Sequence, residues 1–244
     1  MTYLYHGIDY DSLFELAKVM DQDSEYFSRE LRNENLLSFI RERDERKAEK
    51  IKRLSPLSYP DDVFVFLASY VLNPFMDFRL GGYRFSSYKL LGEKMLLSSP
   101  NMNTVLLQIV SYQLLSKHMH STQYDIDHKA VFDKVLSIER QADKDREKAY
   151  FSLAYFLSGK KTLLYKGVEY KDIYNFTHYL MQKERDIEAL GTYLSTSPLI
   201  EAYRDYAKEG EEIDIYLHLV ERYDKDHAKL MDFLDRKKRE KDFS

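Results

Sequence analysis

The stretch YHGIDYDSLFELAKVM, at residues 5–20, decides the fold because nearly the same line returns twice further along the chain. The second copy is LGGYRFSSYKLLGEKM at residues 80–95, and the third is LYKGVEYKDIYNFTHYLM at residues 164–181. Each copy has a glycine, an aromatic ring three residues later, and a serine or an aspartate two residues after the ring. A line that recurs with fixed internal offsets indicates that the chain is built from a repeated unit.

The three lines predict a turn followed by a capped amphipathic helix. Glycine accepts a positive φ, so Gly7, Gly82 and Gly167 allow the chain to turn sharply just before the helix. The serine or aspartate can accept a hydrogen bond from an unpaired N–H of the first helical turn. Apolar or small residues then follow with the spacing i, i+3, i+4, i+7 of one helix face. These residues are Leu13, Leu16, Ala17 and Met20, then Tyr88, Leu91, Gly92 and Met95, then Ile173, Phe176, Thr177 and Leu180.

A further helix is predicted before the second and the third glycine. FLASYVLNP at residues 66–74 precedes the second glycine and SLAYFLSGK at residues 152–160 precedes the third, with Ala68 and Ala154 in corresponding places. The apolar run at residues 63–72 alone would fit a buried strand. Its counterpart lies in a stretch of helical composition, so both segments are predicted to be helical.

A third element, DIDHKAVFDKVL at residues 125–136, is echoed by DKDHAKLMDFLD at residues 224–235. The alternative is that unrelated capped helices look alike, since the first two lines share only four identities in fourteen columns. Three elements in a constant order favour duplication. We therefore predict an all-α protein of roughly ten to thirteen helices without a sheet, in three helical repeats at residues 1–79, 80–163 and 164–244.

Composition agrees with a globular helical protein and removes several functions. The chain has 244 residues with 8 glycines, 5 prolines and no cysteine, and its net charge is −4. The absence of cysteine excludes disulfides, thiol catalysis and thiolate metal ligands. The small net charge gives no general attraction to nucleic acids or anionic membranes. The first residues lack the features of a signal peptide and no apolar run is long enough to span a bilayer, so we expect a cytoplasmic protein.

The repeated line resembles an all-α module of bacterial signalling and chaperone-like proteins, where the module is appended to kinase-like or Hsp70-like domains. The resemblance rests on the glycine–aromatic–cap line together with LAKVM at residues 16–20 and LLSFIRERD at residues 36–44. It covers mainly residues 5–45, 80–97 and 164–204. It implies a protein-interaction or scaffolding role and carries over no catalytic residue, and no kinase-like or ATPase domain accompanies the module here.

The histidine-rich stretch HMHSTQYDIDH, at residues 118–128, offers a metal-binding alternative. Its His118, His120 and His128 are nitrogen ligands that zinc or another divalent metal could use. However, the Asp-x-Asp-His at its end returns at residues 224–227 without the upstream histidines. A feature repeated at a helix start is better explained by acidic N-capping, so no metal or other cofactor is predicted.

A second alternative is a ribonuclease of the HEPN type, a class of small all-α proteins with an Arg-x4-His motif. Arg222 lies five residues before His227, and these residues would stabilise phosphate charge and act on the ribose 2′-hydroxyl or the leaving group. Short motifs of this kind match by chance, and the second repeat has Gln123 in place of the arginine. The ribonuclease and other nucleic-acid-associated roles are therefore kept only as alternatives.

Tyrosine is unusually frequent, with 21 Tyr, 14 Phe and no Trp. One interpretation is that these rings belong to the core and their hydroxyls reach the surface. The other is a groove for a peptide or a partner helix, because tyrosine supplies a large contact area at little entropic cost. The candidate binding residues are Tyr10, Tyr83, Tyr88, Tyr170 and Tyr174.

Two basic clusters, at residues 41–53 and 235–242, have net charges of +3 and +2. Their mixed signs predict exposed helix faces with i, i+4 ion pairs, whereas nucleic-acid binding would need a stripe of one sign. We therefore expect a non-enzymatic cytoplasmic helical-repeat adaptor or scaffold that binds another protein. Nucleic acid is the less favoured partner.

Overall fold

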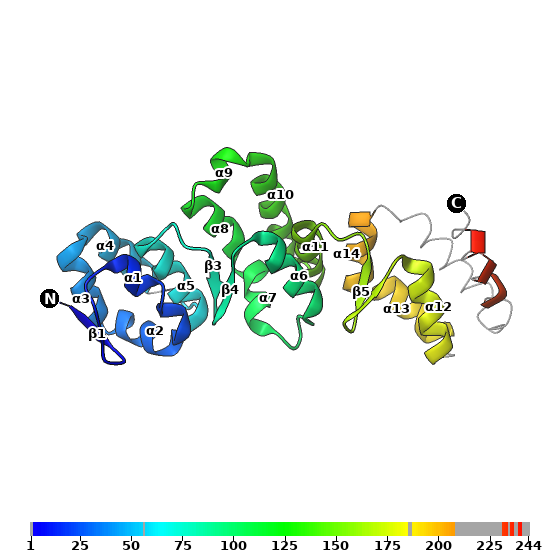
Figure 1. Ribbon diagram of the computed structural model, residues 1–244, viewed down its shortest axis with the longest axis horizontal. Helices are drawn as coiled ribbons and strands as arrows, with labels where there is room; N and C mark the ends of the chain where they lie inside the picture. The colour runs from blue at the N-terminus through cyan, green and yellow to red at the C-terminus, as the bar shows by residue number, and fades with distance from the viewer. Residues whose placement is uncertain are drawn as a thin grey trace.

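The computed structural model describes residues 2–55, 57–184 and 187–207, and three short stretches at 231–233, 235–236 and 239–240. These residues are mostly helical, so the predicted all-α class is confirmed. The elements follow one another along an elongated molecule, with the N-terminus at one end (Figure 1).

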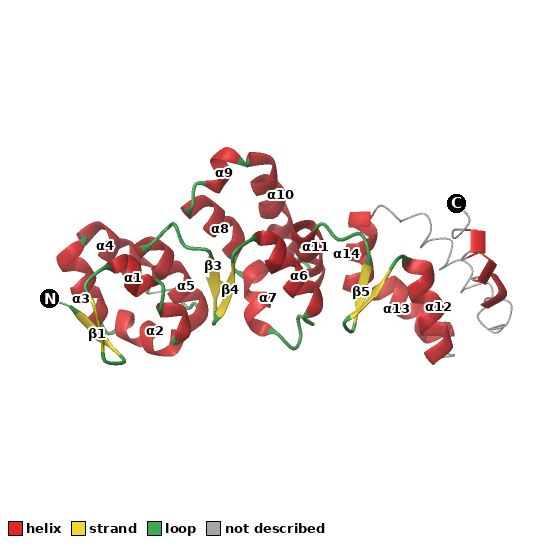
Figure 2. Cartoon of the chain, viewed as in Figure 1, coloured by secondary structure: helices red, strands yellow, loops and turns green. Residues whose placement is uncertain are grey.

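One detail differs from the expected absence of a sheet, because the described part of the chain contains three two-stranded antiparallel hairpins among the helices (Figure 2). Each strand has three residues. The pairs are β1 (Tyr3–Tyr5) with β2 (Ile8–Tyr10), β3 (Phe78–Leu80) with β4 (Tyr83–Phe85), and β5 (Leu163–Tyr165) with β6 (Val168–Tyr170).

The repeated glycines lie in the hairpin turns rather than beside the helices. Gly7, Gly82 and Gly167 have φ angles of 78°, 81° and 78°, and the residue before each has a φ between 49° and 52°. Two consecutive positive φ values define the type I′ turn, which joins two strands through a two-residue loop. The aromatic residue three positions after each glycine therefore ends the second strand of its hairpin.

The helix that follows each hairpin has the predicted cap and the predicted buried face. Ser12, Ser87 and Asp172 each accept a hydrogen bond from a backbone N–H two or three residues later, at 2.9 to 3.3 Å. The helices are α1 (Leu13–Ala17), α6 (Tyr88–Leu97) and α12 (Ile173–Glu184). The residues at i, i+3, i+4 and i+7 are buried in all three lines, except that Tyr88 is half-buried.

The remaining helices complete three segments, each of which begins with a hairpin. The first segment, residues 2–72, continues with η1 (Met20–Gln22), α2 (Ser24–Arg32), α3 (Asn35–Arg43), α4 (Glu45–Leu54) and α5 (Asp61–Leu72). The second segment, residues 78–158, continues with α7 (Thr104–Ser111), α8 (Leu114–Ser121), α9 (Tyr124–Asp127), α10 (Lys129–Arg140), η2 (Gln141–Asp143) and α11 (Arg146–Ser158). The third segment, residues 163–207, continues with α13 (Ile187–Thr196) and α14 (Pro198–Ala207).

The helices predicted before the second and third glycines are α5 and α11, so that prediction is confirmed. The predicted repeat boundaries after residues 79 and 163 fall inside β3 and β5. The element at residues 125–136 falls on α9 and α10, whereas most of its counterpart at residues 224–235 lies outside the described residues.

The second and third hairpins are each tied to the preceding helix by a tyrosine hydroxyl. The Tyr70 hydroxyl of α5 accepts a hydrogen bond from Arg79 N–H at 2.9 Å and donates one to the Asp77 carbonyl at 2.6 Å. The Tyr155 hydroxyl of α11 accepts a hydrogen bond from Leu164 N–H at 3.5 Å. In both cases the N–H donor lies nine residues after the tyrosine. The helix and the following hairpin are therefore joined in the same way twice.

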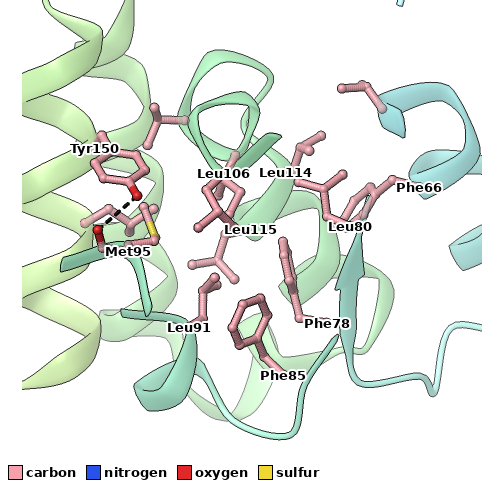
Figure 3. Packing of buried hydrophobic residues seen from close by; sticks show 14 of the residues in the cluster. Phe66, Phe78, Leu80, Phe85, Leu91, Met95, Leu106, Leu114, Leu115 and Tyr150 are labelled. Atoms are coloured by element: carbon pink, nitrogen blue, oxygen red, sulfur yellow. Dashed lines mark hydrogen bonds between the residues drawn. The ribbon is translucent and has the colours of Figure 1, made fainter. Parts of the chain in front are cut away.

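The hydrophobic core passes from the first segment into the second without a break. The rings of Phe66 on α5 and Phe78 on β3 have centroids 5.3 Å apart, and Phe85 and Met95 lie in the same cluster (Figure 3). Beyond Met95, the Tyr150 hydroxyl of α11 donates a hydrogen bond to the Met95 carbonyl at 3.0 Å (Figure 3). This packing fixes the surfaces on both sides of the second segment.

Candidate functional site

A cleft lies between the first and second segments, formed by two adjoining hollows of about 520 and 450 Å³ that share Val71, His120 and Ser121. Helices α4 and α5 form one wall, and α8 and α10 form the other. We call this surface the basic cleft. It includes Lys47, Lys50 and Leu54 of α4, Leu67 and Val71 of α5, Lys117 and His120 of α8, and Phe132 and Leu136 of α10.

The floor of the basic cleft is apolar because α5 carries apolar residues on almost its whole circumference. One side of this helix is buried in the core, which leaves Leu67 and Val71 partly exposed on the opposite side. They line the same hollow as Phe132 and Leu136 of α10, which are also partly buried. A partner could therefore bury apolar surface here, which is the main favourable term in protein association.

Among the described residues that line the basic cleft, three are lysines and none is acidic. The lysines are Lys47, Lys50 and Lys117, and His120 adds an imidazole. The Lys47 Nζ donates a hydrogen bond to the Leu72 carbonyl at 2.9 Å, and the Lys117 Nζ donates one to the Tyr112 carbonyl at 2.7 Å. Burial lowers the pKa of Lys117. A concave surface lined by one sign of charge concentrates its field, which favours an acidic ligand.

Two phenylalanine rings stand at the mouth of the basic cleft. Phe75 is 82% exposed, and Phe14 is also exposed. Asn73 holds both backbones, because its Oδ1 accepts a hydrogen bond from Phe75 N–H at 3.1 Å and its Nδ2 donates one to the Phe14 carbonyl at 3.3 Å. The turn that ends α5 thus presents an aromatic ring to solvent beside the lysines.

A separate hollow, of about 700 Å³, lies between the second and third segments. We call it the neutral groove, and its lining includes Leu97, Met102, Phe151, Tyr165 and Tyr193. Among the described residues that line it, one is acidic, Glu147, and one is basic, Lys166. It therefore offers apolar contact without a preferred sign of charge.

None of the candidate tyrosines with a described side chain lines the basic cleft or the neutral groove. Tyr10 lies on β2, Tyr83 on β4, Tyr88 on α6 and Tyr170 on β6, whereas Tyr174 lies on α12 with its side chain outside the described residues. The Tyr83 hydroxyl accepts a hydrogen bond from the Asn103 side chain at 2.8 Å. The tyrosines that line the basic cleft and the neutral groove are Tyr59, Tyr70, Tyr165 and Tyr193.

The three candidate metal-binding histidines do not converge. His118 is buried, and its Nε2 donates a hydrogen bond to a backbone carbonyl at 3.0 Å, so its Nδ1 accepts one from the Tyr88 hydroxyl at 2.9 Å. Burial lowers the pKa of His118, which agrees with this neutral form. His120 is exposed and pairs with Asp125 at 2.8 Å. No group of three or more His, Asp or Glu in the described residues could hold a metal ion, so the site with His128 does not fit.

The ribonuclease alternative falls on a part of the chain that the structure does not describe. Arg222 and His227 both lie between residues 208 and 230, outside the described residues. The alternative therefore stays a prediction.

The sequence analysis missed the lysines of the basic cleft as a site. Lys47 and Lys50 belong to the cluster at residues 41–53, which the mixed charges indicated as an exposed helix face. The spacing of Ala48 and Ile51 shows which side of α4 is buried, but not what lies beside it. The opposing wall comes from α8 and α10, far along the chain, and no local pattern predicts that proximity.

Within the described residues, no helix has the length and apolar character needed to cross a membrane. Comparisons with protein-family models, with curated proteins and with solved structures find no match. The function is therefore inferred from the geometry and charge of the basic cleft and the neutral groove.

Proposed function

We propose that this chain is a non-enzymatic cytoplasmic adaptor that binds an acidic amphipathic segment of another protein in the basic cleft. The observation that carries the proposal is the combination of an apolar floor with three lysines and no acidic residue among the described residues that line the cleft. An amphipathic helix binds by laying its apolar face in such a hollow, and complementary charges at the edges fix its orientation.

The contacts of such a segment follow from the walls of the cleft. Its apolar side chains would pack against Leu67, Val71 and Phe132 of the floor. Its acidic side chains would meet Lys50 on α4 in one hollow of the cleft and Lys117 on α8 in the other. A basic or neutral segment would gain the same apolar contact but would lose these ion pairs.

The same cleft suits a nucleic acid less well. Single-stranded nucleic acids bind along basic grooves in which aromatic rings stack on successive bases. Rings such as Phe14 and Phe75 do line this cleft, but the aliphatic Leu67, Val71 and Leu136 share its lining, and the net charge of the chain is −4. Protein is therefore the partner class that we propose.

The three hairpin-and-helix lines support the helical-repeat part of this proposal. Each has the same two-residue turn, the same five-residue distance from the glycine to the N-cap, and the same buried helix face. Junctions between successive repeats would then supply clefts that differ in charge, as the basic cleft and the neutral groove do.

The proposal can be tested with two synthetic helical peptides of about four turns that share a leucine face. One has glutamate and the other lysine on the opposite face, and fluorescence anisotropy measures their binding to the protein. We expect the acidic peptide to bind more tightly, and less tightly at high salt. Lys50→Glu should weaken its binding roughly fivefold, whereas Lys89→Glu, an exposed lysine of α6 outside the cleft, should not.

A second pair of variants tests the apolar contact. Phe75→Ala should weaken binding of the acidic peptide, while Met102→Ala, at an equally exposed residue of the neutral groove, should leave it unchanged. Equal affinity for the two peptides, or equal effects of Lys50→Glu and Lys89→Glu, would contradict the proposal. Tighter binding of a single-stranded oligothymidylate that is lost in Lys50→Glu would replace it with a nucleic-acid role.

A further inference from the structure

The middle residue of the first hairpin's β1 strand is exposed, whereas the equivalent residue of the third hairpin's β5 strand is buried. Leu4 and Leu164 are the middle residues of β1 and β5, at the same distance from their turn glycines. Leu164 is 5% exposed and its N–H donates a hydrogen bond to the Tyr155 hydroxyl of α11, whereas Leu4 is 62% exposed. Figure 1 shows β1 at the N-terminal end of the elongated molecule.

The backbone N–H and C=O groups of Leu4 and Leu164 point away from the other strand of their hairpin. In a hairpin with a two-residue turn, the residues flanking the turn exchange hydrogen bonds, and the next pair directs its N–H and C=O groups outwards. In the second and third hairpins the outward N–H, of Arg79 or Leu164, donates to a tyrosine hydroxyl of the preceding helix. No described residue accepts a hydrogen bond from Leu4 N–H.

The first hairpin also repeats a polar detail of the third. Thr2 Oγ1 donates a hydrogen bond to Asp9 Oδ1 at 2.8 Å, and Thr162 Oγ1 donates one to Glu169 in the equivalent place. In the third hairpin, this glutamate also pairs with Lys160 at 3.4 Å. Lys160 follows the end of α11 by two residues, so the helix and its basic tail each make one polar contact with this hairpin, through Tyr155 and Lys160.

We propose that the outer edge of β1 binds the C-terminal end of an amphipathic helix from a partner protein. In this complex a tyrosine hydroxyl accepts the Leu4 N–H, apolar residues of the helix cover Leu4, and a basic residue just after the helix pairs with Asp9. The tyrosine and the basic residue of the partner thus reproduce the contacts that Tyr155 and Lys160 make at the third hairpin. Helices α5 and α11 of a second copy would not supply this helix, because Tyr70 and Tyr155 are already buried in their own chain.

The probe is a labelled peptide with the sequence of residues 145–161, which contains α11 and its basic tail, added to the full chain. Fluorescence anisotropy should show saturable binding. Leu4→Lys should weaken this binding roughly tenfold, because it removes most of one buried leucine contact. Ile126→Lys on α9 is the matched control, since it places the same charge at another exposed aliphatic residue and should have no effect.

Two changes in the peptide test the polar contacts. Tyr155→Phe removes the accepting hydroxyl and should weaken binding roughly fivefold. Lys160→Glu should also weaken binding, and Asp9→Lys in the protein should restore it by reversing both charges.

The proposal is overturned if the peptide does not bind, or if Leu4→Lys and Ile126→Lys have the same effect. Self-association of the full chain, measured by sedimentation, that disappears in Leu4→Lys would assign the edge to a second copy instead. Circular dichroism verifies that each variant is folded. These outcomes are independent of Lys50, so they do not depend on the basic cleft.

Discussion

Asp21 and Arg84 join the first two segments, with the Asp21 Oδ2 atom 3.3 Å from the Arg84 Nε atom. Asp21 lies on η1 and is 7% exposed, while Arg84 lies on β4. Arg84 is the cross-strand neighbour of Arg79, which also approaches Asp21, at 3.9 Å. Like charges directly opposite each other destabilise a hairpin, so the buried carboxylate offsets a repulsion within the second hairpin.

Asp21→Asn should therefore destabilise the protein by about 2 kcal/mol, because it leaves two neighbouring guanidinium groups without their carboxylate. Arg84→Met in the same background should recover part of this loss, since it removes the repulsion with Arg79. Urea denaturation measures both effects. Asp133→Asn, at an exposed residue of α10, is the control and should change stability by less than about 0.5 kcal/mol. A loss no larger than that of the control would show that the carboxylate does not hold the junction.

Loss of the Tyr70 hydroxyl should destabilise the protein more than loss of the Tyr155 hydroxyl. Burial raises the pKa of both hydroxyls, which keeps them neutral. Tyr70→Phe leaves two backbone partners unpaired and should lower the free energy of unfolding by about 2 kcal/mol. Tyr155→Phe loses one contact of 3.5 Å and should lower it by less than about 1 kcal/mol. Chemical denaturation that gave the reverse order would contradict this assignment of the two contacts.

Gly92 is predicted to be intolerant of any side chain. A Cβ atom at this position of α6 would lie 2.5 Å from the Ser158 N atom and 2.8 Å from the Ala154 carbonyl oxygen of α11. Both are backbone atoms, so the two helices would have to separate. Gly92→Ala should cost about 3 kcal/mol despite the higher helix propensity of alanine. Thermal or urea unfolding compares it with Lys89→Ala on the exposed side of α6, and similar stabilities would show that the helices can move apart freely.

The residues that the sequence analysis interpreted correctly are those whose roles are local. Ser12, Ser87 and Asp172 cap the helices that follow them, and the apolar spacing identified the buried faces. Caps and helix faces depend on residues within two turns of each other, so the sequence contains the whole signal.

The hairpins were missed because their strands are too short to show an alternating pattern. The turns His6–Gly7 and Lys166–Gly167 also lack the Asn-Gly or Asp-Gly pair that usually marks a type I′ turn.

The predicted correspondence between α5 and α11 is wrong by one residue. The sequence pattern matched Ala68 with Ala154, whereas the hydrogen bonds to the hairpins show that Tyr70 corresponds to Tyr155. The basic cleft depends on tertiary proximity of α4 and α5 to α8 and α10, which no local periodicity reveals.

Glu139 is a buried carboxylate of α10 that caps the N-terminus of another helix, α8. It lies on α10 and is 1% exposed, and its two oxygens accept hydrogen bonds from Leu115 N–H at 2.9 Å and Ser116 N–H at 3.2 Å in the first turn of α8. The residue before α8, Gln113, makes no side-chain cap of its own. Burial raises the pKa of Glu139 to about 7, although the two N–H groups and the nearby Lys117 act in the opposite direction.

Stability should therefore fall as the pH rises through this range. Below about 4.5 the carboxyl is protonated in both the folded and the unfolded chain, and between about 4.5 and 7 only the unfolded chain releases the proton. Relative to Glu139→Gln, which does not titrate, the wild type should lose about 3 kcal/mol across this range. Urea denaturation of both proteins at acidic, intermediate and mildly alkaline pH measures the difference. Glu49→Gln, at an exposed residue of α4, is the control. If the free energy of unfolding of the wild type, relative to that of Glu139→Gln, stays constant or rises with pH, Glu139 is ionised throughout.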